Sequence, residues 1–136
     1  MYNNIIVAVD LEHGDAGKAL LAHASALVDA GGTVRLLHVI EDVPSYIAAE
    51  LPRDLNDRRQ AEAKVELGLL TQGAGTNVVS EVRMGAASSQ ILQCAEDTGA
   101  DLIMIASHRP GLSDYFIGST AARVVRHAQC SVLIRR

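Results

Sequence analysis

Apolar residues along the chain follow two alternating patterns. Short apolar runs rich in Val and Ile alternate with longer segments in which apolar residues recur every three or four positions. The first pattern is typical of buried β-strands and the second of amphipathic helices. Strands are therefore predicted over residues 5–10, 33–40, 76–84, 102–105 and 131–134. Helices are predicted over residues 16–30, 54–72, 85–98 and 121–127.

Glycines are expected to end three of these helices, because glycine readily adopts the left-handed conformation that closes a helix. They are Gly31 with Gly32, Gly73 with Gly75, and Gly99. The second helix is strongly charged and is interpreted as exposed and amphipathic. Its apolar face is formed by Ala61, Val65 and Leu69, with Gln72 at the same spacing. Residues 41–52, bracketed by Pro44 and Pro52, predict no clear element.

Strands and helices alternate from one end of the chain to the other. Right-handed crossovers between such strands produce a parallel sheet with helices on both faces. We therefore predict an open, doubly wound α/β fold, Rossmann-like or flavodoxin-like. Placing the first strand at the centre, beside the fourth, gives the strand order 3-2-1-4-5. At 136 residues the chain is expected to form one domain, residues 1–136.

Composition narrows the class of partner. Aromatic residues make up only 3% of the chain, so Ala, Val, Ile and Leu must build the core. The net charge is −4 and there is no long basic run, which argues against nucleic acid as a partner. No apolar run reaches the roughly 20 residues that span a bilayer, so no membrane insertion is expected. Cys94 and Cys130 are interpreted as buried, reduced thiols, and the predicted location is cytoplasmic.

The carboxyl ends of the predicted strands point to a ligand site. Ligands of open α/β sheets bind at these ends, where the strand order reverses. Asp10 ends the first strand, residues 39–41 end the second, and Met84 and Gly85 end the third. The loop after the fourth strand, residues 106–111, reaches the same rim. Asp10 could accept hydrogen bonds from a ligand or cap the next turn.

The start of the last helix could bind phosphate. Gly118, Ser119 and Thr120 directly precede the helical pattern. A helix N-terminus offers unpaired N–H groups and partial positive charge, and Gly118 lets an anion approach the backbone. The alternative is an ordinary strand-to-helix loop with a Ser or Thr cap.

Three segments carry a resemblance to a known family: NNIIVAVD, RLLHVIED and ADLIMIASHRPGLSDYFIGSTAARVVRHAQCSVLIRR. Over its whole length the chain resembles the universal stress proteins, and its Ser-His-Arg-Pro segment resembles the F/G branch of small bacterial members. The resemblance implies a doubly wound fold. In one branch it also implies ATP binding through a G-x2-G-x9-G-[S/T] motif.

Carried onto this chain, Gly118 and Ser119 match the last pair of the motif and would hold the phosphates. Ala106 and Arg109 stand where the motif has its first two glycines. Eight residues separate Arg109 from Gly118, one fewer than in the motif. Arg109 could contact phosphate, and Gly111 could supply flexibility.

The resemblance further implies that Asp10 contacts the ribose or adenine and that the Val39 backbone contacts the adenine. Any Mg²⁺ that accompanies ATP would be held mainly by the phosphates. The full set of residues expected to bind the nucleotide is Ala8, Val9, Asp10, Val39, Met84, Gly85, Ala106, Ser107, His108, Arg109, Gly111, Gly118, Ser119 and Thr120.

Two functions remain open at this point. The first is an ATP-binding regulatory or stress-response module whose nucleotide state alters partner contacts, with at most slow hydrolysis. The second is a member of the same family that binds no nucleotide and acts as a dimeric interaction module. An enzyme is less favoured, because no general base is evident near Ser107 or Ser119. A receiver-type phosphorylation domain is poorly supported, since Met84 and Ser107 stand near the strand ends where it needs Asp and Lys.

The last strand predicts self-association. Ser131, Val132, Leu133 and Ile134 form a short apolar strand at the expected sheet edge. An unpaired apolar edge invites another chain, so a homodimer paired through this strand is expected, and a higher oligomer is possible. The alternative is a monomer whose edge is guarded by the terminal arginines.

Overall fold

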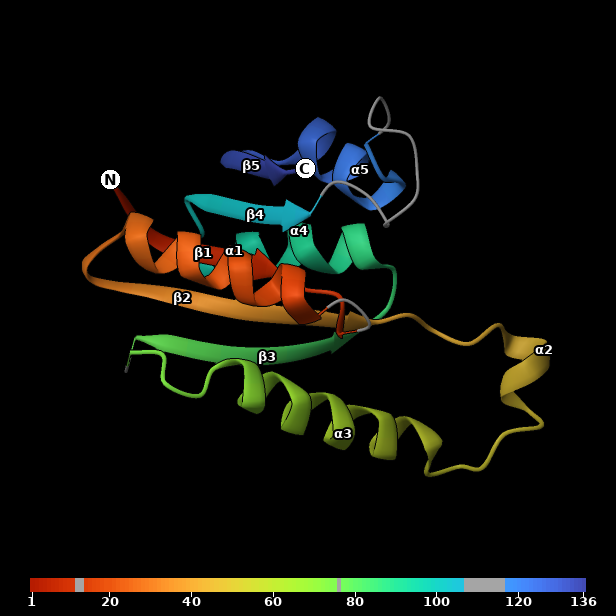
Figure 1. Ribbon diagram of the computed structural model, residues 1–136. Helices are drawn as coiled ribbons and strands as arrows, with labels where there is room; N and C mark the ends of the chain where they lie inside the picture. The colour runs from red at the N-terminus through yellow and green to blue at the C-terminus, as the bar shows by residue number, and fades with distance from the viewer. Residues whose placement is uncertain (12–13, 76, 107–116) are drawn as a thin grey trace.

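The computed structural model describes residues 1–11, 14–75, 77–106 and 117–136. A five-stranded parallel sheet in the order β3-β2-β1-β4-β5 forms its centre, as predicted (Figure 1). The strands are β1 (Tyr2–Ala8), β2 (Val28–Ile40), β3 (Val78–Met84), β4 (Leu102–Ala106) and β5 (Ser131–Arg135). The helices are α1 (Gly14–Leu27), α2 (Ser45–Ala48), α3 (Leu55–Leu70), α4 (Ala87–Thr98) and α5 (Ser119–His127).

The helices cover the sheet on both faces, α1 and α3 on one face and α4 and α5 on the other (Figure 1). Successive residues of β1 point to opposite faces, so Ile5 and Val7 pack under α1 while Ile6 packs under α4 and α5. All three side chains are fully buried. Covering both faces explains why the central strands are continuous apolar runs in the sequence.

The predicted end of the first helix is wrong. Helix α1 ends at Leu27, and Gly31 and Gly32 lie inside β2. Gly31 has φ +82°, and the pairing of β1 with β2 jumps from Tyr2 opposite Val28 to Asn4 opposite Thr33. A Cβ on Gly32 would lie 2.7 Å from the Asn3 carbonyl oxygen. The glycines therefore allow an irregular stretch of sheet pairing rather than a helix cap.

The apolar face predicted for the second helix is also wrong. Helix α3 buries Ala63 and Leu67, whereas Val65 and Leu69 are 65% and 57% exposed. The physical reason is that residues 63, 67 and 70, like residues 61, 65 and 69, recur every three or four positions, so either series can form one face of a helix. The position of α3 against β2 and β3 decides which stripe is buried.

The segment without a predicted element contains the short helix α2. None of its residues is buried, and Tyr46 is 76% exposed. This segment projects away from the sheet (Figure 1). None of the helices in the described part of the chain is long and apolar enough to span a bilayer.

Candidate functional site

A groove of about 980 Å³ opens at the carboxyl ends of the central strands. It collects residues from the ends of β1, β2 and β4 and from the start of α5. The predicted site residues that line it are Ala8, Val9, Asp10, Val39, Ala106, Gly118, Ser119 and Thr120. The topology therefore brings these residues together as the sequence predicted.

The third strand contributes differently from the prediction. Met84 does not line the groove, and its Sδ accepts a hydrogen bond from Gln60 Nε2 at 2.7 Å. Gly85 lines a smaller, neighbouring hollow of about 380 Å³. Its φ is +135°, and its N–H donates to the Ile40 carbonyl at 2.9 Å, which joins the ends of β2 and β3. The other predicted residues, Ser107, His108, Arg109 and Gly111, lie outside the described residues.

Hydrogen bonds between neighbouring strands hold the chain in place just before Asp10. The Val9 N–H donates to the Leu37 carbonyl at 2.9 Å. His38 Nδ1 lies 3.1 Å from the Val9 carbonyl oxygen. Because a carbonyl can only accept, Nδ1 donates in this bond. His38 therefore positions the end of β1.

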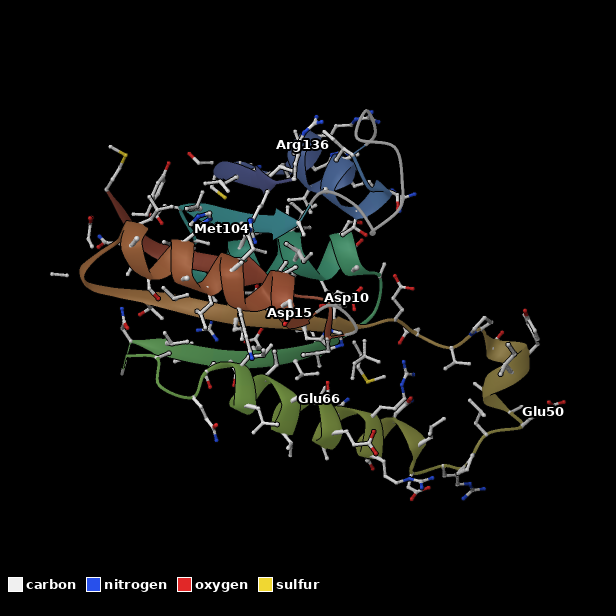
Figure 2. The ribbon with its side chains drawn as sticks, in the orientation of Figure 1. Asp10, Asp15, Glu50, Glu66, Met104 and Arg136 are labelled. Carbon is white, nitrogen blue, oxygen red and sulfur yellow. The ribbon has the colours of Figure 1, made fainter. Side chains whose placement is uncertain are left out.

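Helix α3 supplies a side of the groove that the sequence analysis missed. Its residues Arg59, Glu62, Ala63 and Glu66 line the groove. Asp10 at the end of the sheet and Glu66 on α3 lie on different sides of it (Figure 2). Had the stripe of residues 63, 67 and 70 been chosen as the buried face, Glu62 and Glu66 would have been expected beside it.

Within the described part of the chain, the start of α5 carries backbone donors without a side-chain cap. Its N-cap residue is Gly118, which has no side chain to serve as a cap. The first intrahelical bond runs from the Ala122 N–H to the Gly118 carbonyl at 2.9 Å. The N–H groups of Ser119, Thr120 and Ala121 therefore have no partner within the helix. The alternative of a Ser or Thr cap is wrong.

The two cysteines are free and differ in their surroundings. Cys94 is fully buried, and its Sγ donates to Glu81 Oε2 at 3.4 Å. Burial, reinforced by the Glu81 carboxylate, raises the pKa of Cys94 to about 11. Arg35 and Arg83 pair with the same carboxylate. This cluster joins β2, β3 and α4 outside the groove, and its thiol stays protonated at neutral pH.

No group of three or more His, Cys, Asp or Glu side chains within the described ranges is arranged to bind a metal ion.

Comparison with known proteins identifies relatives of the whole chain. A model of the universal stress protein family matches residues 1–136. Universal stress protein G of Escherichia coli O157:H7 is 31% identical over 143 aligned positions that cover 100% of both proteins.

Solved structures show the same fold. The structure of hypothetical protein MJ0577 has a TM-score of 0.83 at 26% identity, covering 100% of this chain and 98% of the other. A universal stress protein solved in complex with cAMP has a TM-score of 0.63 at 23% identity, covering 99% and 97%. At that identity the second likeness concerns the fold alone.

Proposed function

Because this chain belongs to the universal stress protein family, we propose that its groove binds ATP with Mg²⁺ and that the nucleotide state regulates contacts with other proteins. One observation carries the proposal. The uncapped N-terminus of α5 opens into the same groove as Asp10 and Val39. Phosphate binds well at such a helix start.

The groove has the size and surface that a nucleotide needs. Its volume falls within the range of about 300–1,000 Å³ that is usual for small-molecule sites. Ala8, Leu20, Val39 and Ile91 supply apolar surface for a base. The Asp10 carboxylate can accept hydrogen bonds from ribose hydroxyls. Gly118 leaves the backbone N–H groups of Ser119 and Thr120 open to phosphate.

Binding rather than catalysis is the proposed activity. Gly118, Ser119 and Thr120 can hold a phosphate but include no carboxylate or imidazole to activate water. We therefore expect at most slow ATP hydrolysis. Mg²⁺ would be held by phosphate oxygens, with Glu41 as the carboxylate that lines both the groove and the neighbouring hollow.

Mass spectrometry of the freshly purified, denatured protein tests the proposal first. We expect ATP or ADP to be released. Calorimetry of the nucleotide-free protein with ATP and Mg²⁺ should then give a saturable heat. Absence of both a released nucleotide and a heat at millimolar ATP would contradict the proposal. It would favour the alternative, a member of the family that binds no nucleotide and acts through protein contacts. The carboxylates of Glu62 and Glu66 in the groove are the observation that favours that alternative.

We also propose a homodimer paired through β5. This strand lies at the edge of the sheet beside β4, and Val132, Leu133 and Ile134 are only partly buried. Pairing with a second copy would cover the open edge.

Val132→Pro removes a backbone donor from that edge and should shift the protein toward monomer in sedimentation experiments. The control is Val125→Ser, at an exposed position of α5, which should leave the dimer intact. Proline is not used at Val125 because it would break the helix. A wild-type monomer at tens of micromolar would exclude the dimer, and the charged terminal residues Arg135 and Arg136 would then guard the edge.

A further inference from the structure

Helix α3 carries a second apolar stripe on the side that faces away from the sheet. This outer stripe consists of Ala61, Val65 and Leu69, and its two large members are 65% and 57% exposed. The opposite side of the helix already packs into the core through Leu67. A stripe of apolar residues along a helix is typical of a face that packs against another surface. Within the described part of the chain, no element covers the outer stripe.

The segment between β2 and α3, residues 41–54, forms an arm that projects beyond the start of α3 (Figure 1). The arm contains α2, none of whose residues is buried. Its backbone hydrogen bonds are local, since the N–H groups of Ile47 and Ala48 donate to the Pro44 carbonyl at 2.9 and 3.0 Å. Tyr46 and Ile47 are 76% and 37% exposed. The arm therefore presents apolar side chains to solvent without a core of its own.

Exposed apolar surface is concentrated on these two features. Apart from the terminal Met1, the three most exposed large apolar side chains among the described residues are Tyr46, Val65 and Leu69. Apolar surface gathered in this way, unlike scattered single residues, is typical of an interaction site. None of the three side chains lines the groove, so the proposed ligand site does not account for them.

The positions of the two features along the chain favour a second copy as the occupant. The arm lies beyond the first residue of α3, whereas Val65 and Leu69 lie in the second half of the helix, about 15–20 Å further along its axis. Two antiparallel α3 helices that overlap at their first halves would place the arm of each copy over the second half of α3 in the other. Every contact is then made twice, as in a closed two-fold dimer.

The charges of the two surfaces are complementary. The acidic residues of the arm outnumber its one arginine, and they are Glu41, Asp42, Glu50 and Asp54. Figure 2 shows Glu50 on the projecting arm, well away from Glu66 on α3. Lys64 is exposed beside Val65 on α3. Among the described residues, neither Glu50 nor Lys64 has an ion-pair partner, so each is available to a second copy.

We propose that the arm of one copy docks on the outer stripe of α3 in a second copy, and that the second copy docks on the first in the same way. Tyr46 and Ile47 of each copy cover the outer stripe of the other, and Glu50 of each copy pairs with Lys64 of the other. The contact is independent of the proposed ATP site and of the proposed pairing through β5, which lies at the opposite edge of the sheet from β3 and α3.

The docking is expected to be weak. Two short segments bury less surface than the roughly 1,200 Å² at which standard interfaces begin, so a Kd of about 0.1 mM is expected. At low micromolar concentrations the copies are then separate, and the outer stripe contributes little to the free energy of unfolding.

A tryptophan on the arm reports the docking directly, because the chain has no tryptophan of its own. In Tyr46→Trp, the emission should shift to shorter wavelength and acrylamide quenching should decrease as the protein concentration rises from about 5 μM to about 0.5 mM. The same change is expected without nucleotide and in the presence of Val132→Pro. An emission typical of exposed tryptophan at every concentration would overturn the proposal. A change caused by ATP at about 5 μM, and not by concentration, would overturn it as well, because the arm would then close over the groove.

Val65→Gln combined with Leu69→Gln removes the receiving surface. Glutamine is a good helix former, so unfolding at low micromolar concentration should be unchanged. The concentration needed for the tryptophan shift should rise about tenfold or more, because the apolar contact is lost. Val125→Gln, at an exposed apolar position of α5, is the matched control and should keep the shift. If the double variant associates as the wild type does, the arm does not dock on the outer stripe.

Mixing two charge variants shows whether the contact joins two copies. Glu50→Lys and Lys64→Glu should each associate about fivefold more weakly than the wild type at low salt, because each brings like charges together. An equal mixture of the two should associate as the wild type does, since each contact in a mixed pair again joins opposite charges. Single variants that associate normally would overturn the pairing of Glu50 with Lys64. If one chain carrying both changes recovers but the mixture does not, the arm contacts its own α3 and the proposal is wrong.

Discussion

The two sides of the groove differ in charge. On the α3 side, Glu62 and Glu66 present carboxylates, and Arg59 is directed toward the Glu41 carbonyl, with Nη2 to oxygen at 3.4 Å. On the α4 and α5 side, the groove is bordered by helix N-termini, whose first N–H groups have no partner within the helix. This difference in charge can orient a bound ligand. A ligand with one neutral and one anionic end is expected to place its anionic end at α4 and α5.

Gly118→Val should destroy the anion-binding side of the groove. A branched side chain at the N-cap would cover the N–H groups of Ser119 and Thr120. Losing two hydrogen bonds to phosphate, each of about 1.5 kcal/mol or more, should weaken ATP binding about a hundredfold or more. Calorimetry measures the effect. Gly68→Val is the control, because a Cβ on Gly68 meets nothing within 4 Å. Normal ATP binding by Gly118→Val would show that α5 does not hold the phosphates.

Comparing Leu67→Ala with Val65→Ala tests which face of α3 is buried, and therefore whether Glu62 and Glu66 face the groove. Leu67 is fully buried, so its truncation should lower the free energy of unfolding by about 2–5 kcal/mol. Val65→Ala, on the exposed stripe of the same helix, should change it by less than about 0.5 kcal/mol. Urea denaturation followed by circular dichroism compares them. The reverse order would mean that α3 is rotated and that its carboxylates face elsewhere.

Asp10→Ala tests the end of the groove opposite the phosphates. Removing a carboxylate that accepts ribose hydroxyls should weaken ATP binding by about 1–2 kcal/mol. Asp10→Asn keeps one acceptor oxygen and should lose less. Because the ribose is common to both ligands, calorimetry should find equal losses for ATP and AMP. A loss confined to ATP would place Asp10 beside the phosphates instead.

The double variant Glu62→Gln, Glu66→Gln tests the negative charge on the α3 side of the groove. Of the four changes, we expect this one to have the smallest effect. Removing two negative charges near a polyanion should tighten ATP binding by about twofold to fivefold at low salt. The gain should disappear at about 1 M salt, where the Debye length is about 3 Å. Glu96→Gln, an exposed carboxylate on α4 that does not line the groove, is the control. Weaker binding by the double variant would mean that these carboxylates hold a cation or a ligand donor.

Several features of the site could be predicted because their signals are local. An apolar run that ends in Asp10, and a glycine followed by Ser119 at a helix start, are each visible within a few residues. The topology then follows from the alternation of strands and helices, so the meeting of β1, β2, β4 and α5 at one rim was predictable. The family resemblance, confirmed by the match over residues 1–136, led to the same rim.

Other features depend on packing between distant segments. The sequence did not determine which stripe of α3 is buried, because both stripes recur every three or four residues. The contact of α3 with β2 and β3 decides between them. The carboxylates of Glu62 and Glu66 belong to the groove only as a result of that choice. Gly31 and Gly32 were likewise ambiguous, since glycine suits both a helix cap and an irregular strand.

The chain by itself thus determined the parallel sheet, its strand order and the rim at which a ligand can bind, because hydrophobic periodicity and crossover handedness are properties of consecutive residues. Tertiary structure alone decided that α4 begins beside α5, so that Ser88 is buried in a hollow shared with Thr120 and Arg123. These residues lie on helices separated by a strand, and only the packing of both helices on one face of the sheet brings their N-termini together.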